Sequence, residues 1–250
     1  MDEWQYQHAG DFGLPVGRRF SSVHRESGLF SSLTRHLWWA CASGYARVWH
    51  RLKVIDRHLL PDAAPFVMIA NHSSHLDTLT MAAALPMRLR ERAFPIAAQD
   101  TFFHTTLRRS FSALMLNALP MWRRNCGRHG VGDLRTRLVE DACVFVLFPE
   151  GTRTRDGRIG AFKPGLGMLV AGTAVRIVPC HIRGAFQALS PGRHLPRPAS
   201  ITLRIGEPQT FQNISNCREG WQQIAREMHS RVAMLATTPP PASESTSPPG

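Results

Sequence analysis

The sequence predicts an α/β fold with a single sheet, mixed but largely parallel, that is flanked by helices and preceded by an amphipathic helical segment. Short apolar runs rich in β-branched and aromatic residues alternate with longer segments of helical periodicity, the pattern of strands connected by helices. The run Cys143–Phe148 (CVFVLF) is apolar at every position. Such a run is typical of a central strand buried on both faces.

The same alternation places the individual elements of one domain, expected over residues 55–236. Strands are expected at residues 65–70, 94–98, 118–122, 143–148, 175–182 and 200–206. Helices are expected at residues 78–85, 101–116, 131–141, 165–172 and 221–235. The tail at 237–250 is rich in proline and serine and is expected to be disordered.

The N-terminal region divides into a polar arm, residues 1–28, expected to be loosely ordered, and a helix expected over residues 29–54. Five apolar residues of the helix recur at spacings of three and four and share one face: Trp38, Cys41, Tyr45, Val48 and Leu52. With its basic flanks, this helix can lie in a membrane interface or pack on the domain. The stretch Leu37–Ala46 is the longest uncharged one here and is too short to cross a bilayer.

The charge of the chain favours an anionic partner. The 250 residues carry a formal net charge of +12 and a pI of about 11.0, which suits nucleic acid, an acidic membrane surface or a phosphorylated substrate. Arginine supplies 28 of the 30 basic residues. Genome base composition can explain this preference for arginine over lysine, but it does not explain the excess of basic over acidic residues. Five cysteines without a C-x-x-C pair, and no signal-peptide pattern at the N-terminus, indicate a reducing compartment.

The segment ANHSSHLDT, residues 70–78, is the first candidate site. It follows the apolar strand 65–70, and ligands bind at strand ends in open α/β sheets. His72 on the strand-end turn and Asp77 in the first helical turn can meet as a general base and the carboxylate that orients it. A metal site of His72, His75 and Asp77, a nucleophile at Ser73 or Ser74, and a polar turn are alternatives that the spacing leaves open.

The second candidate site is the segment FPEGTRTRDGR, residues 148–158, at the end of the central strand. Arg153 can hold a phosphate through two hydrogen bonds, and Thr152 and backbone N–H groups can add donors. Glu150 can bind a hydroxyl or anchor a basic side chain, and Lys163 can add positive charge nearby. A solvated hairpin turn is the alternative. The segment 120–124 (PMWRR) contributes a further pair of arginines and is the weakest of these signals.

Taken together and in order, these residues resemble the glycerolipid acyltransferase family, which includes 1-acylglycerol-3-phosphate acyltransferases. The family motif N-H-x-x-x-x-D matches at Asn71, His72 and Asp77, and the motif F-P-E-G-T-R-[ST] matches in full at 148–154. A later F-K-x-G motif matches at 162–165 and an apolar motif around a proline at 177–180. The family's second motif departs at its start, where Asn117 stands for a glycine, and Arg123 is its arginine on spacing. The resemblance covers about residues 55–210.

The resemblance implies a glycerol-phosphate acyltransferase-like fold and transfer of an acyl group from a thioester to a hydroxyl of a lysophospholipid. His72 would be the base and Asp77 its orienter, whereas Ser73 and Ser74 are turn residues and His75 is structural. The residues implied in substrate binding are Arg123, Glu150, Gly151, Thr152 and Arg153. No metal or cofactor is implied.

The resemblance also implies the partners. The acyl donor is acyl-CoA or acyl-carrier protein, and 1-acylglycerol-3-phosphate is the favoured acceptor, with glycerol-3-phosphate or a lyso-ornithine lipid as alternatives. The protein is expected to act peripherally at the cytoplasmic face of the membrane, without nucleic acid. The rival hypotheses are a metal-dependent hydrolase, a nucleic-acid-binding protein, for which the sequence holds no motif, and a catalytically silent membrane-binding relative.

Overall fold

The computed structural model describes residues 29–90, 92–98, 119–121, 128–193 and 195–238. Within them a seven-stranded sheet has the order β1-β7-β6-β2-β5-β3-β4. The strands are β1 (Lys53–Ile55), β2 (Phe66–Ala70), β3 (Ala93–Ala98), β4 (Leu119–Met121), β5 (Val144–Leu147), β6 (Arg176–Arg183) and β7 (Thr202–Ile205). Every neighbouring pair is parallel except β6 and β7. The predicted mixed, largely parallel sheet is confirmed.

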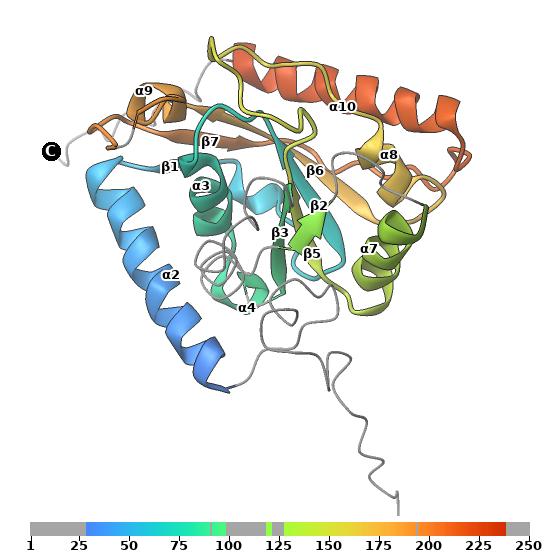
Figure 1. Cartoon of the computed structure of the whole chain (residues 1–250), viewed down its shortest axis with the longest axis horizontal. Coiled ribbons are helices and arrows are strands. Elements are labelled where there is room, and N and C mark those ends of the chain that lie inside the picture. Colours follow the sequence, from blue (N-terminus) through green and yellow to red (C-terminus); the bar gives the residue numbers. More distant parts are fainter. Residues whose placement is uncertain (1–28, 91, 99–118, 122–127, 194, 239–250) are drawn as a thin grey trace, which may run out of the picture.

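Helices cover both faces of this sheet (Figure 1). They are α2 (Leu29–Trp49), α3 (Leu76–Ala84), α4 (Met87–Arg90), α7 (Arg128–Glu140), α8 (Gly165–Val170), α9 (Ala185–Ala188) and α10 (Arg218–Thr237), with a short 3-10 helix at Arg57–Leu59. α7, α8 and α10 share one buried apolar cluster with the sheet, and α3, α4 and α9 share the other. Each face of the central strands is therefore buried, as their unbroken apolar sequence predicts.

The central strand β2 shows how the two clusters divide the sheet. Val67 and Ile69 enter the cluster beneath α10, while Phe66, Met68 and Ala70 enter the cluster beneath α3. All five are fully buried. Because successive side chains of a strand point to opposite faces, an entirely apolar run is what a strand between two helical layers requires.

The contact between α8 and α10 depends on a glycine. A Cβ at Gly167 would lie 2.4 Å from the Cα of Trp221, closer than atoms can approach, so the two helix backbones meet where no side chain intervenes. This contact packs α10 against the segment that follows the 148–164 loop. It thereby supports the loop that contains the second candidate site.

The N-terminal helix is shorter than the predicted segment 29–54. α2 ends at Trp49 because Arg51 adopts a left-handed conformation, with φ of 43°, and the Leu52 N–H donates to the carbonyl of Ala46 at 3.1 Å. Lys53 then begins β1, the edge strand that pairs with β7. The arm at 1–28, the expected helix at 101–116 and most of the tail at 237–250 lie outside the described residues.

One face of α2 packs on the domain and the opposite face is exposed. Trp39, Ala42, Ser43 and Ala46 are buried, and the first two pack against Ala82 of α3. A stripe from the predicted apolar face points outward instead: Cys41, Tyr45 and Val48 are exposed, as is Leu37 one turn earlier. The helix therefore packs on the domain and still presents an apolar face. None of the described helices is both long and apolar enough to span a bilayer.

Candidate active site

The first candidate site begins at the carboxyl end of β2, where the side chain of Asn71 extends the sheet. Its Nδ2 donates to the carbonyl of Ile182 at 3.0 Å, and its Oδ1 accepts the N–H of Ile182 at 2.8 Å. The side-chain amide of Asn71 thus bonds to the backbone of β6 as one more backbone amide of β2 would. This pairing fixes where the chain leaves the sheet and so fixes the position of the next residue, His72.

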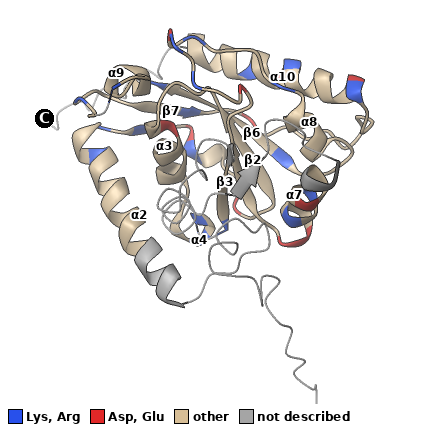
Figure 2. Ribbon diagram, in the orientation of Figure 1, with Lys and Arg blue, Asp and Glu red and all other residues tan. Residues whose placement is uncertain are grey.

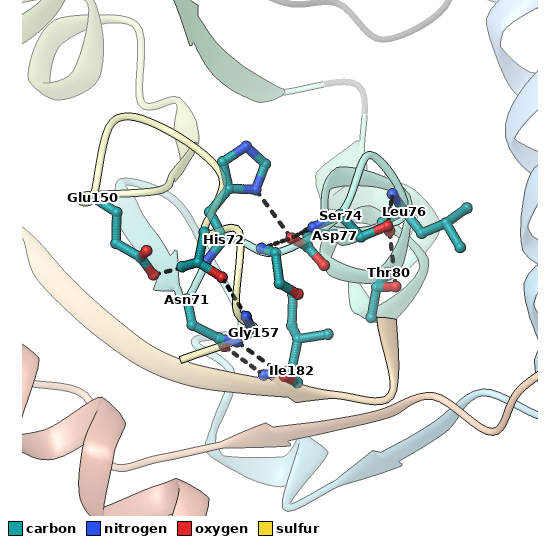
Figure 3. A network of polar contacts seen from close by, with 11 residues as sticks. Asn71, His72, Ser74, Leu76, Asp77, Thr80, Glu150, Gly157 and Ile182 are labelled. Carbon is teal, nitrogen blue, oxygen red and sulfur yellow. Dashed lines mark hydrogen bonds and ion pairs between the residues drawn. The ribbon is translucent and has the colours of Figure 1, made fainter. Parts of the chain in front are cut away.

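His72 and Asp77 meet in the arrangement that the sequence allowed, with His72 on the turn after β2 and Asp77 in the first turn of α3. His72 Nδ1 lies 3.0 Å from Asp77 Oδ2 (Figure 3). Asp77 is fully buried, and the same oxygen accepts the N–H groups of Ser73 at 2.6 Å and Ser74 at 2.7 Å. An ionised carboxylate can only accept, so the neutral imidazole carries its proton on Nδ1 and leaves Nε2 with a lone pair.

Ser73 and Ser74 make hydrogen bonds that stabilise the turn. Ser73 and Ser74 are buried, and the hydroxyl of Ser74 accepts the N–H of Leu76 at 3.1 Å, at the start of α3. A serine nucleophile needs an exposed hydroxyl next to a base. The arrangement instead agrees with the expectation that both are turn residues.

Phe148 lies against the face of the His72 ring. The two ring centroids are 4.2 Å apart and the planes differ by 15°. Phe148 ends the apolar run of the central strand, and the register of β2 with β5 pairs Ile69 with Leu147, so the residues that follow both strands are neighbours. With Asp77 at its edge and Phe148 on its face, the imidazole has one favoured orientation, and its side chain is only 16% exposed. The sequence alone did not assign this contact.

Glu150 holds the backbone of His72 from the neighbouring turn. Its Oε1 accepts the N–H of His72 at 2.9 Å (Figure 3). From the same loop, the N–H of Thr154 donates to the carbonyl of His72 at 2.9 Å. Glu150 is only 6% exposed, and burial is the main cause that raises its pKa to about 7. Hydrogen bonds from the N–H groups of His72 and Gly160 oppose that increase, and Asp77 adds to it.

The turn after β5 requires a glycine. Gly151 has φ of 73°, in the left-handed region that residues with a Cβ rarely adopt. A Cβ there would also lie 2.8 Å from Nζ of Lys163. Lys163 is held over the turn because its N–H donates to the carbonyl of Pro149 at 2.9 Å. Its ammonium group therefore adds positive charge at this turn, as the sequence predicted.

Arg153 is close enough to His75 for its charge to act on that imidazole. Loss of hydration lowers the pKa of the His75 imidazole, and the positive charges of Arg153 and His72 lower it further, whereas Asp77 raises it. The charge of Arg153 therefore reaches His75 on the turn that also holds His72. Thr152 is exposed on the same loop. Arg123 lies outside the described residues.

The metal hypothesis finds no support in this geometry. His72 directs Nδ1 to Asp77. Among the described residues, no group of three or more His, Cys, Asp and Glu side chains is placed to hold a metal ion. The carboxylate instead orients the imidazole by a direct hydrogen bond, which is the arrangement of a base and its orienter.

Comparison with known proteins gives the family. A family model described as Acyltransferase matches residues 51–183, which include both candidate segments. The chain belongs to this acyltransferase family. The structure also resembles the crystal structure of the 1-acyl-sn-glycerophosphate (LPA) acyltransferase PlsC from Thermotoga maritima, with a TM-score of 0.61, 21% identity, and coverage of 88% of this chain and 86% of that one. At that identity the likeness establishes a shared fold.

Two curated relatives indicate what other members of this acyltransferase family do. The chain is 30% identical to the 1-acyl-sn-glycerol-3-phosphate acyltransferase alpha of Mus musculus, over 66% of this chain and 57% of the relative. It is 27% identical to the chloroplastic 1-acyl-sn-glycerol-3-phosphate acyltransferase LPAT1 of Arabidopsis thaliana, over 76% of this chain and 52% of the relative. The chain thus spans little more than half the length of these relatives.

We predict that Glu150 makes the stability of the protein fall as the pH rises. Its folded-state pKa is about 7 against an ordinary value of 4.5, so its stabilising contribution is complete below pH 4.5 and is lost as the pH passes through 7. The shift corresponds to about 3 kcal/mol. Urea unfolding of the wild type and of Glu150→Gln from acidic to mildly alkaline pH should show the wild type losing about that much relative to the variant. Parallel pH curves for the two proteins would contradict the assignment.

Proposed function

We propose that the chain is an O-acyltransferase that moves a fatty acyl group from a thioester to a hydroxyl of a lysophospholipid. Acyl-CoA or acyl-carrier protein is the donor, 1-acylglycerol-3-phosphate is the favoured acceptor and phosphatidate is the product. The observation that carries this proposal is the His72–Asp77 pair. Asp77 accepts the hydrogen bond of His72 Nδ1, so Nε2 can act as the base. The family assignment and the names of the two relatives support the choice of reaction and acceptor.

In the proposed mechanism, His72 Nε2 removes the proton of the acceptor hydroxyl as its oxygen attacks the thioester carbonyl. The tetrahedral intermediate then collapses, the C–S bond breaks, and the leaving thiolate takes the proton from the His72 imidazolium. Asp77 stabilises that imidazolium through the hydrogen bond at 3.0 Å. This sequence forms one ester bond and releases one thiol, without a covalent enzyme intermediate.

The acceptor phosphate is proposed to lie at the turn after β5. Arg153 supplies a positive charge that acts on the neighbouring His75, and the backbone at Gly151 and the hydroxyl of Thr152 can add hydrogen bonds. Arg123 is proposed as a further phosphate ligand from the family's second motif. Because Glu150 bonds to the backbone N–H of His72, we propose that it contributes by holding the base in place while any contact with the acceptor is secondary.

The reaction is tested by thiol release from acyl-CoA with a panel of lyso-lipid acceptors and purified protein in detergent. We expect release only in the presence of an acceptor, fastest with 1-acylglycerol-3-phosphate. We expect His72→Ala to reduce it by at least about 100-fold, since a positioned base contributes that much or more. Met234→Ala, on the exposed side of α10, is the matched control and should retain wild-type rates. Acceptor-dependent release that persists in His72→Ala would rule out His72 as the base.

The outward face of α2 is proposed to bring the enzyme to its lipid substrates. Leu37, Tyr45 and Val48 are exposed, and Figure 2 shows the described part of α2 almost without charged residues apart from a basic position near its C-terminal end. An apolar stripe on a helix attached to a basic protein can insert into an acidic membrane interface. The protein would then act as a peripheral enzyme at the cytoplasmic face.

Vesicle binding tests the role of this face. We expect Val48→Glu to weaken co-sedimentation with vesicles of mixed neutral and acidic phospholipids by about tenfold or more, because a charge replaces apolar surface in the interface. Thiol release in detergent should remain, since the Val48 side chain is 82% exposed and makes no part of the buried core. Val139→Glu on α7, also exposed, controls for the added charge. Equal vesicle binding by the wild type and Val48→Glu would exclude α2 as the membrane contact.

A further inference from the structure

Phe148 contacts the proposed base but has no part in the proton transfer or in the phosphate site described above. Its ring lies nearly parallel to the His72 imidazole, with 4.2 Å between the ring centroids and 15° between the planes. The imidazole is therefore over the face of the phenyl ring. The face of an aromatic ring carries the negative part of its quadrupole, whereas the edge carries the positive part.

The position of Phe148 is fixed by its backbone and by its packing. Leu147 pairs with Ile69 in the sheet, and the carbonyl of Phe148 accepts the N–H of Gly151 at 3.0 Å in the turn that follows. The side chain is half-buried and packs against the apolar cluster beneath α3. The ring is thus held over the imidazole before any substrate binds.

The charged groups around His72 act on other parts of the residue or on its edge. Asp77 Oδ2 lies 3.0 Å from Nδ1, in the plane of a hydrogen bond. Glu150 bonds to the backbone N–H of His72, and His75 and His72 repel each other when both carry positive charge. A charged imidazole at His72 would therefore have a carboxylate at its edge and the phenyl ring of Phe148 on its face.

The charge of the His72 ring changes during the proposed reaction. The ring is neutral before the attack and becomes an imidazolium when Nε2 takes the hydroxyl proton. A cation within about 6 Å of an aromatic centroid is attracted by the ring face, and the attraction grows when water is excluded. The His72 side chain is only 16% exposed. An interaction that is stronger in the charged state than in the neutral one lowers the barrier.

We propose that Phe148 stabilises the imidazolium of His72 through the face of its ring and is in this way a positioning residue for the reaction. The inference rests on the proposed acyl transfer and adds a residue to it. A purely structural role would need only the shape of the phenyl ring, because shape is enough to keep the imidazole in its orientation. Stabilisation of the charge also needs the electron density of the ring face, and the two roles can be separated.

Fluorination of the ring separates them, because fluorine withdraws electron density from the face and changes the shape little. We compare the wild type with Phe148→4-fluorophenylalanine and Phe148→pentafluorophenylalanine in the thiol-release assay. We expect kcat to fall along this series, by at least about threefold for the pentafluoro variant, while KM for the lysophospholipid stays unchanged. Phe211→pentafluorophenylalanine, in the other apolar cluster, is the matched control and should keep the wild-type kcat. An equal kcat across the Phe148 series would overturn the inference.

A second measurement needs no turnover. The pH at which the His72 ring takes up its second proton, followed by NMR through the ring nitrogens, should fall by about 0.5 units or more from the wild type to Phe148→pentafluorophenylalanine. Asp77, His75 and Glu150 are the same in both proteins, so the difference reports on the ring of Phe148. Equal midpoints would overturn the inference. If no acyl transfer is found in the wild type, the proposed function fails, but this titration still decides whether Phe148 stabilises the charged imidazole.

Discussion

One buried carboxylate oxygen, Asp77 Oδ2, organises the turn on which the proposed chemistry depends. It accepts hydrogen bonds from the His72 ring and from the N–H groups of Ser73 and Ser74. A buried charge is costly unless such donors surround it. The chain between β2 and α3 must therefore wrap around the carboxylate, and this wrapping directs the imidazole toward it. The same interaction that stabilises the turn sets the tautomer of the proposed base.

The parallel register of β2 and β5 joins this turn to a second one 78 residues away in the chain. Because Ile69 pairs with Leu147, Phe148 reaches the face of the His72 ring and Glu150 reaches its backbone N–H. The catalytic group is thus held by two strand ends of a rigid sheet, which positions side chains better than a free loop can. From the second turn, the charge of Arg153 acts on His75.

The sequence predicts those parts of the structure whose signals are local. The apolar runs of β2 and β5 and the periodicity of α10 identify these elements to within a few residues. The edge strand β1 was missed because three residues carry no pattern and pair only through their backbone with β7. The end of α2 was missed because it depends on the left-handed conformation of Arg51. Periodicity also finds the apolar stripe of α2 but does not tell which face of the helix packs on α3.

Within the candidate site, the spacing of His72 and Asp77 allows their hydrogen bond because both belong to one short turn, and the family resemblance favours it over the alternatives. The roles of Glu150 and Phe148 toward His72 could not be predicted, since they follow from the register of two strands that are distant in sequence. The motif at 148–154 indicates that these residues serve one site. The pairing of β2 with β5 determines that Phe148 and Glu150 contact His72.

The tautomer of His72 in ¹⁵N-labelled protein, observed by NMR through the two ring nitrogens, decides most directly whether Asp77 prepares His72 as a base. We expect a neutral ring protonated on Nδ1, with Nε2 unprotonated, and we expect Asp77→Asn to change this preference. A ring protonated on Nε2 in the wild type would contradict this mechanism, because Nε2 would then lack the lone pair that the proposed reaction requires. An unchanged spectrum in Asp77→Asn would contradict the role of Asp77 in setting the tautomer.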